Sequence, residues 1–386
     1  MPQLVGKALL AGLIPLGALA LHGFAASNGL IQRFEDLKAD PLLSDGVTLY
    51  STNYTSSEGF NGLLRTLLNF FWPVVNGHDA RLSLYSFMFG GQGVALMMLN
   101  LLEGMRHGNR GLMVSFITIY GMLYMVVGLA VMAPLYLLLH LLTSPTAHKP
   151  NKTNVAISGT SAQGAIFGTL AGYIMPNILM CLPVASVISV ESKALAVVLW
   201  QAVPLWSACC ALAWSTLAPK TARKNGKEPD GTAYVRAAYQ FGVVVAGISH
   251  VSTLAVSFAA WLSPGIFNPA VASTLAPLGL LLPPNPLDRA TTITSFLQGA
   301  TWFLQWDYTM MSAAYMVWSL TLRYASTSAR RRADSLALPK LLVSVFLRAT
   351  LLGPIGATLS LVWERDEEAW KTSEPGTGQQ KTRKSR

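Results

Sequence analysis

The chain has 386 residues, of which 52% are hydrophobic and 12% charged, and its mean hydropathy is +0.42. Soluble domains carry nearer a quarter charged residues, so this composition excludes an ordinary soluble domain and indicates a polytopic membrane protein. The net charge of +10 does not indicate nucleic acid as a partner. The basic residues gather in short connections and in the tail 371–386, which is typical of orientation signals and anionic-lipid contact.

Apolar runs long enough to cross a membrane recur along the chain. A span needs roughly 18 or more mostly apolar residues. The predicted spans are 8–26, 82–102, 112–141, 163–187, 194–217, 234–262, 293–322 and 338–363. We therefore predict an all-α transmembrane helical bundle of about eight spans, with one domain over 1–365 and a charged, disordered C-terminal tail over 366–386.

The N-terminal region contains one ambiguous span and one polar loop. Residues 8–26 also resemble a signal peptide, but Pro15 within the apolar run favours a retained span. The polar loop 27–58 carries Asn53 in an Asn-Tyr-Thr glycosylation acceptor. The segment 60–76 is apolar but short, so we predict a re-entrant or interfacial helix there.

Membrane sidedness stays open at this point. Loops 142–160, 218–233 and 323–340 hold most of the Lys and Arg residues, and the positive-inside rule places them in the cytosol. With eight spans the acidic loop before 60–76 falls on the same side, and Asn53 stays unmodified. If 60–76 crosses the membrane instead, that loop becomes lumenal and both signals agree.

Small residues mark two helix faces. In "QGAIFGTLAG" the glycines Gly164, Gly168 and Gly172 are four residues apart, so they share one face and predict a close approach to a neighbouring helix. "FGGQG" at 89–93 is interpreted in the same way. A phosphate-binding loop is disfavoured there, because no strand precedes it and no Lys-Ser/Thr follows.

The stretch "WFLQWDYTMM" places Asp307 in the middle of an apolar run. A carboxylate at such a position costs at least ~2.5 kcal/mol, so it usually has a function or a partner. The residues one turn away are apolar, and such surroundings disfavour the anion. A neutral carboxylic acid in an apolar pocket is a proton donor. We predict a functional acid, with a hydrogen bond to a neighbouring helix as the alternative.

The same span is rich in aromatic side chains, among which Trp302, Trp306 and Tyr308 are candidate substrate-binding residues. Aromatic faces stabilise cations, by about 2 kcal/mol when the contact is desolvated. Because these three residues lie at different angles around one helix, only some of them can face one cavity.

Three further polar residues in apolar runs are candidates. Glu103 ends the second span near Arg106, and a catalytic role and an interfacial position stay equally open. His250 is either a proton shuttle or, more in keeping with a lone histidine, a packed residue bonded to a serine or a carbonyl. Gln92 is predicted to form interhelical bonds or to line the substrate pocket.

Several enzyme motifs are missing from the sequence. There is no DDxxD pair to hold magnesium and a diphosphate, and no HExxH, GxSxG or Walker loop. The three cysteines have no metal-ligand spacing. These absences argue against an enzyme that ionises a prenyl diphosphate.

Two stretches carry a resemblance to a known family. "FWPVVNGHDARLSLYSFMFGGQ" (71–92) and "TWFLQWDYTMMSAAYMVW" (301–318) resemble the fungal membrane-bound terpene cyclases of the ascofuranone and macrophorin pathway type. The layout and length agree over most of residues 1–365.

The resemblance implies cyclisation of the farnesyl or epoxyfarnesyl chain of a meroterpenoid intermediate, by acid protonation and a carbocation cascade. Such an enzyme is an isomerase or lyase, and the resemblance implies no metal and no cofactor. The resemblance assigns no catalytic residue, but for this chemistry the residues themselves lead us to predict Asp307 as the acid and Glu103 as a second acid or proton acceptor. The expected partners are membrane lipid, a prenylated aromatic substrate, and a pathway epoxidase and prenyltransferase. The expected location is the endoplasmic reticulum membrane.

Two other classes of function stay open. One is a proton-coupled small-solute transporter in which Asp307 and His250 form the coupling pair. The other is a non-catalytic membrane scaffold for a biosynthetic complex. A transporter needs an internal repeat and a water-accessible path, a cyclase needs an aromatic pocket, and a scaffold needs Asp307 paired with no cavity beside it.

Overall fold

The computed structural model describes residues 2–38, 43, 46, 53–217, 231–288, 290–326 and 337–371. Within these residues every regular element is a helix, apart from a single bridge between Val184 and Ile188. The predicted all-α fold is therefore confirmed for the described part of the chain.

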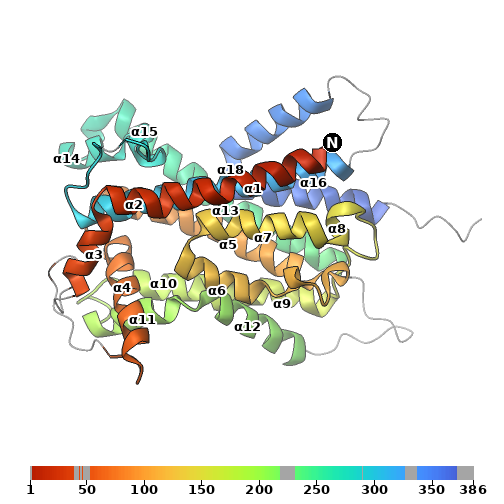
Figure 1. Ribbon diagram of the computed structural model, residues 1–386, viewed down its shortest axis with the longest axis horizontal. Coiled ribbons are helices and arrows are strands. Elements are labelled where there is room, and N and C mark those ends of the chain that lie inside the picture. The colour runs from red at the N-terminus through yellow and green to blue at the C-terminus, as the bar shows by residue number, and fades with distance from the viewer. Residues whose placement is uncertain are drawn as a thin grey trace, which may run out of the picture.

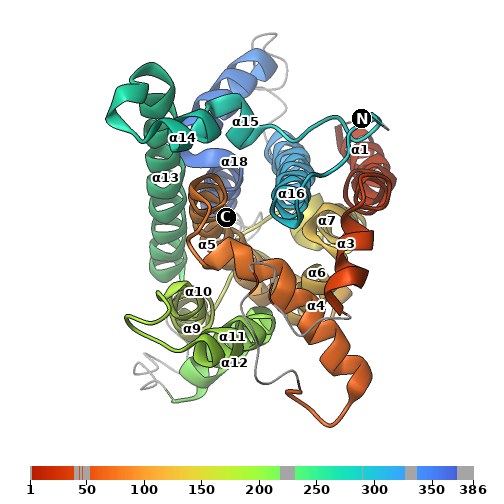
Figure 2. The same ribbon diagram turned by 90° about the vertical axis from the view of Figure 1, so that its left-hand side faces the viewer.

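The helices assemble around a common axis. The first half of the chain contributes α1 (Pro2–Ala18), the π-helix η1 (Leu19–Gly23), α2 (Phe24–Ser27), α3 (Leu30–Lys38), α4 (Glu58–Val75), α5 (Ala80–Met105), the 3-10 turns η2 (His107–Asn109) and η3 (Met113–Ser115), α6 (Ile117–Val127), α7 (Leu129–Thr143) and α8 (Pro145–His148). The second half contributes α9 (Gly159–Thr169), the π-helix η4 (Leu170–Ile174), α10 (Met175–Cys181), α11 (Val190–Trp200), α12 (Val203–Leu217), α13 (Thr232–Leu262), α14 (Pro269–Ala272), α15 (Pro277–Leu281), α16 (Phe296–Ser326) and α18 (Ala337–Lys371). The long helices run side by side along this axis in Figure 1, and Figure 2 looks along it.

Five helical stretches of the described chain are long and apolar enough to cross a membrane. They are Gln3–Ser27, Ala80–Met105, Gly159–Cys181, Thr232–Leu262 and Leu338–Lys371. A sixth is counted if α11 and α12, which meet at a bend of 73°, form one span. These apolar helices are compatible with an integral membrane protein, but the expected eight spans are not confirmed.

Two of the predicted spans differ from expectation for separate reasons. The run 112–141 breaks at Gly128 into α6 and α7, which at about 1.5 Å per residue are each shorter than a ~30 Å hydrocarbon core. The run 293–322 forms the 31-residue helix α16, which is long enough but is not among the candidate spans. Its polar residues, Asp307 among them, lower its hydropathy.

The two ends of the predicted domain are both helical. The apolar run 8–26 lies within the continuous helical stretch Gln3–Ser27. The segment 60–76 forms α4, which is not among the candidate spans. At the other end, the predicted boundary after residue 365 falls inside α18, which continues to Lys371, and Asp366 is fully buried. That boundary is therefore wrong, because "ERDEE" continues a packed helix rather than beginning a tail.

The predicted close approach of the glycine face is confirmed. Any Cβ placed on Gly168 or Gly172 would collide with α12, at the backbone of Ser207 in both cases. Gly164 meets the same helix one turn further on, at Ala211. The lack of side chains at these three glycines thus sets how closely α12 packs.

Helix α18 is kinked near its middle. Gly353 has φ +73°, in the left-handed region that favours glycine, and Pro354 follows it without a backbone N–H. Such a break leaves backbone groups without intrahelical partners, and each one needs another partner when it is surrounded by apolar atoms.

Gln92 of α5 supplies those partners. Its Nε2 donates to the carbonyl oxygens of Ala246 (3.0 Å) and Leu352 (2.9 Å), and its Oε1 accepts from the N–H groups of Ile355 (3.0 Å) and Gly356 (3.2 Å). Both amide hydrogens and both acceptor lone pairs are occupied. Gln92 therefore holds the kink of α18, and its amide has no capacity left for a substrate.

Replacing Gln92 by Leu is expected to lower the thermal midpoint of the detergent-solubilised protein. Each buried group left unpaired costs about 1–3 kcal/mol, so the total loss should exceed ~2 kcal/mol. The matched control is Gln163→Leu, because Gln163 accepts a single bond from the exposed Trp214 indole. Equal midpoints for the two variants would contradict the role assigned to Gln92.

Candidate active site

Asp307 projects from α16 onto the first turn of α7. Its Oδ1 accepts a hydrogen bond from the backbone N–H of Ala130 at 2.7 Å, and the residue is 7% exposed. Helix α7 begins directly after Gly128, which has φ +96° and offers no side chain to cap the helix. Asp307 therefore supplies, from another helix, an acceptor for an N–H group that the first turn leaves unpaired.

Apolar and aromatic side chains enclose this junction. Leu21 and Ala130 form a buried cluster with Ala20 and Met310, and Phe303 and Trp306 pack against it. The Phe303 ring also meets Phe70 of α4 edge-on at 5.2 Å. Within the described residues Asp307 forms no ion pair. The site is thus a carboxyl group on a helix N-terminus, with aromatic rings beside it.

The other two aromatic residues predicted for the site lie on different faces of α16. Trp302 stacks on Phe24 of α2 at 5.9 Å. Tyr308 packs against Tyr85 and Phe89 of α5, at 6.1 and 5.2 Å. Trp306 borders the Asp307 junction, and its indole N–H donates to the carbonyl oxygen of Pro284. The predicted trio therefore does not form one wall. Phe303, one turn before Asp307, was missed although its i−4 spacing pointed to it.

A second polar centre lies around Glu103 at the other end of α5. One carboxylate oxygen contacts Arg106 Nε at 2.8 Å and the other accepts from Arg365 Nη2 at 2.8 Å. All three side chains are at most 1% exposed. Two guanidinium groups hold this carboxylate as an anion, so Glu103 is neither interfacial nor suited to donate a proton.

Residues from three more helices complete this centre. Asp366 accepts from Arg106 (2.9 Å) and from the Tyr239 hydroxyl of α13 (2.6 Å). The Trp318 indole N–H of α16 donates to His140 Nδ1 at 3.1 Å, which leaves the His140 Nε2–H to donate to Glu103 at 3.3 Å. The sequence indicated the proximity of Glu103 and Arg106 but not the rest of this network. The charged run after Val362 was a second signal, and most of it was interpreted as a tail.

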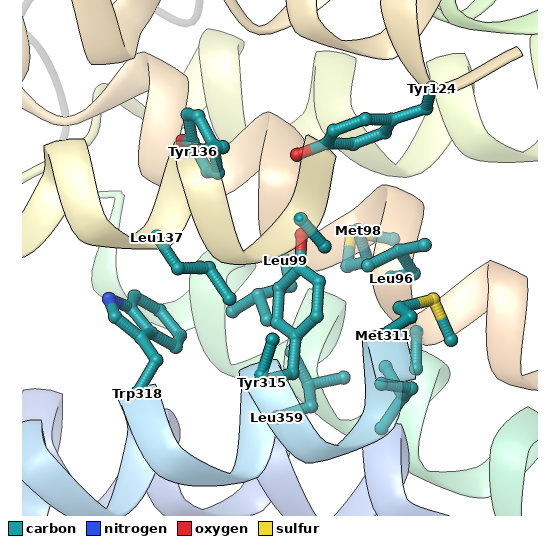
Figure 3. Packing of buried hydrophobic residues seen from close by; sticks show 14 of the residues in the cluster. Leu96, Met98, Leu99, Tyr124, Tyr136, Leu137, Met311, Tyr315, Trp318 and Leu359 are labelled. Carbon is teal, nitrogen blue, oxygen red and sulfur yellow. The ribbon is translucent and has the colours of Figure 1, made fainter. Parts of the chain in front are cut away.

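The two centres are too far apart to act on one bond. Trp318, which contacts the Glu103 centre through His140, is 11 residues after Asp307 on α16 (318 − 307), or about 16 Å along the helix. Met311 and Tyr315 lie between Asp307 and Trp318 along α16. Figure 3 shows Tyr315 projecting between Met311 and Trp318, with Leu99 and Tyr124 around it. All of these side chains belong to the buried core.

The remaining predicted residues lie elsewhere. His250 of α13 is 8% exposed, and its Nδ1 has no hydrogen-bond partner in the described chain. The His250 ring hydrogen-bonds the backbone of Thr350 in α18, and no contact joins it to Asp307, so the described residues give no coupling pair. Asn53 is exposed ahead of α4. Two hollows of the described chain do not border Asp307: one lies along α18 at Lys340 and Arg348, and one of about 50 Å³ lies at Lys152 and Trp370.

Replacing Gly128 by Ala is expected to lower both stability and activity. An added Cβ would require the left-handed φ of +96°, would lie 3.1 Å from Asp307 Oδ1 and would collide with Leu21. The control is Gly12→Ala, because a Cβ on Gly12 meets nothing within 4 Å and helical Gly→Ala usually stabilises by about 0.5–1 kcal/mol. A Gly128→Ala enzyme that matches Gly12→Ala in thermal midpoint and product formation would contradict this junction.

The fold is a helical bundle compatible with an integral membrane protein, and it sets a carboxyl group among aromatic side chains of its helices. The chain belongs to the CtvD-domain family, whose model matches residues 6–369. It is 51% identical to the terpene cyclase ascI of Acremonium egyptiacum, over all of this chain and 98% of that protein. It is 28% identical to the terpene cyclase ctvD of Aspergillus terreus over 91% of this chain and 96% of that protein, and 29% identical to the terpene cyclase atmA of Aspergillus flavus over 82% and 84%.

These similarities confirm the resemblance to fungal membrane-bound terpene cyclases and indicate an enzyme. No solved structure matches the chain. Nothing in the fold or in the relatives supports the transporter alternative.

Proposed function

We propose that this enzyme cyclises the farnesyl or terminally epoxidised farnesyl chain of a meroterpenoid intermediate in fungal secondary metabolism. The observation that carries the proposal is the similarity to terpene cyclase ascI over the whole chain. A farnesyl chain partitions into the bilayer, so a site among apolar helices is a natural place to fold it. The expected location is a multi-pass position in the endoplasmic reticulum membrane.

Asp307 is the proposed acid. Its proton passes to the epoxide oxygen, the C–O bond breaks, and the π electrons of the next double bond form a C–C bond to the carbon left positive. The positive charge then moves along the chain until a proton is lost, or until a substrate hydroxyl closes an ether ring and loses its proton. The released proton, directly or through solvent, restores the Asp307 carboxyl group for the next turnover. Atoms balance between substrate and product, so the reaction is an isomerisation.

The surroundings of Asp307 favour this step in two ways. Once the proton has left, the carboxylate keeps the hydrogen bond from Ala130 and lies at the positive end of the α7 dipole. The Phe303 and Trp306 rings pack beside the same junction, where aromatic faces stabilise a carbocation and exclude water. Glu103 is left out of the mechanism, because its two arginine partners hold it as an anion about 16 Å away along α16.

The chemistry of the substrate implies which classes of enzyme must supply it. A prenyltransferase must attach the farnesyl chain to an aromatic ring, and an epoxidase must oxidise the terminal alkene if the epoxide is the true substrate. Both are proposed pathway partners, and membrane lipid is the proposed surrounding.

The test uses sealed microsomes that contain the protein, fed a farnesylated phenol and, separately, its terminal epoxide. A product of unchanged mass and altered retention is expected from one of the two substrates, and microsomes without the protein should give none. If neither substrate is converted while the protein is present and folded, this substrate class is wrong.

A further inference from the structure

The chain changes direction at Gly128, and this determines which loops lie at which end of the bundle. Tyr120 of α6 packs on Tyr136 of α7 with ring centroids 4.9 Å apart, so the two helices form an antiparallel hairpin. The Tyr136 hydroxyl donates to the Val114 carbonyl oxygen, which precedes α6. The run 112–141 therefore enters and leaves at the same end and does not cross from one end to the other.

That end, called the α8 end here, gathers several segments. The N-terminal Gln3 donates to the carbonyl oxygen of Ala147 in α8, and Gly231, at the start of α13, packs on Ile157. Figure 1 shows the N-terminus, α8 and the end of α12 at this end, whereas α3, α11 and α14 lie at the other, called the α3 end. At the α3 end, Asn28 accepts a bond from the Ile293 N–H just before α16.

The two ends of the bundle differ in their content of lysine and arginine. At the α8 end the basic residues include Arg106, Arg110, Lys149, Lys152, Arg236, Arg323, Arg365 and Lys371, and the acidic ones are Glu103, Glu364, Asp366, Glu367 and Glu368, which pair with arginines of the same end. The helix ends there also lead into 218–230, with four Lys and Arg, and 327–336, with three consecutive arginines. At the α3 end the described acidic residues are Glu35, Asp36, Glu58, Asp79, Glu191 and Asp288, and the basic ones are Arg33, Lys38, Arg65, Arg81 and Lys193. Lysine and arginine are retained on the cytosolic side of a membrane.

Two glycosylation acceptors lie at opposite ends. Asn53-Tyr54-Thr55 precedes α4 at the α3 end, and Asn151-Lys152-Thr153 follows α8 at the α8 end. Both asparagines are exposed. N-linked glycans are added only on the lumenal face, so one of the two is available for modification.

We infer that the α8 end faces the cytosol and the α3 end faces the lumen, with Asn53 glycosylated and Asn151 unmodified. The conflict between the basic loops and the sequon, which the sequence leaves open, arises only if 112–141 crosses the membrane. Because this run doubles back at Gly128, the basic loops and Asn53 lie on opposite faces and α4 does not have to cross.

The modification is tested on the full chain expressed in a eukaryotic host, with endoglycosidase treatment and gel mobility as the readout. Removal of the glycan should increase the gel mobility of the wild type. Asn53→Gln is expected to abolish this mobility shift, and Asn151→Gln is expected to leave it unchanged. A shift lost in Asn151→Gln overturns the orientation, and an unshifted wild type overturns the assignment of Asn53.

The orientation has a second, independent readout. An externally added protease that cuts after Lys and Arg should cleave within 218–230 in sealed microsomes without detergent. Cleavage at this segment only after detergent is added would overturn the inference. Neither experiment depends on cyclase activity, so the proposed function can fail while the topology holds.

Discussion

Replacing Asp307 by Asn is expected to reduce cyclised product by at least about 100-fold at equal amounts of folded protein. General acids contribute roughly 10²–10⁴ in rate, and an amide has no acidic proton to give. The Asn Oδ1 still accepts the hydrogen bond from Ala130, so the start of α7 keeps its cap. Product is measured by chromatography and mass spectrometry of microsomes fed the epoxide.

Asp307→Ala separates the two roles of this side chain. It removes both the proton and the acceptor for the Ala130 N–H, and losing a helix cap costs about 1 kcal/mol. We expect it to be as inactive as Asp307→Asn and less stable. If Asp307→Asn stays active while Asp307→Ala loses only stability, Asp307 is a structural cap and the acid lies elsewhere.

Replacing Glu103 by Gln is expected to lower stability strongly, with little effect on turnover per folded molecule. It leaves Arg106 and Arg365 buried with one carboxylate, Asp366, between them. Breaking a buried ion pair from one side costs about 3–5 kcal/mol. The measurement is the thermal midpoint in detergent, with product formation normalised to the folded fraction.

The matched control makes the same chemical change at the surface. Glu58 pairs with Arg65 and is 75% exposed, and exposed ion pairs are worth about 0–1 kcal/mol. Glu58→Gln should therefore scarcely shift the midpoint. A Glu103→Gln protein as stable as this control but inactive would place the chemistry at Glu103 and refute the division between the two centres.

The sequence predicted those features of the fold that depend on local pattern. The glycine spacing at Gly164, Gly168 and Gly172 predicted the close contact with α12, because small residues four apart always share a helix face. The prediction of one span over 112–141 was wrong, because this run breaks at Gly128 into two short helices. An apolar run of 30 residues (112–141) has the composition of a span whether it crosses or folds back, and only the left-handed φ at one glycine decides between the two.

The candidate site was predicted in part. The apolar spacing around Asp307 predicted a carboxyl group in apolar surroundings, and the structure buries it there, with a hydrogen bond to the backbone of a neighbouring helix. Helical geometry indicated that only some of the three predicted rings could face one cavity, but which rings accompany Asp307 depends on neighbouring helices. Phe303 was therefore missed, and Tyr308, a candidate, packs on α5. Arg365 and Asp366 were missed because a charged run near the C-terminus resembles a tail unless its partners on α5 and α13 are known.

The proposed mechanism requires the chemistry to take place at Asp307 and not at the Glu103 centre. The most direct measurement is a single-turnover assay with the epoxide, on equal folded amounts of wild type, Asp307→Asn and Glu103→Gln. The account predicts product from wild type and from Glu103→Gln at similar rates, and none from Asp307→Asn. Asp307 is not the acid if Asp307→Asn forms product at the wild-type rate. The same assignment is contradicted if folded Glu103→Gln is the one variant that forms no product.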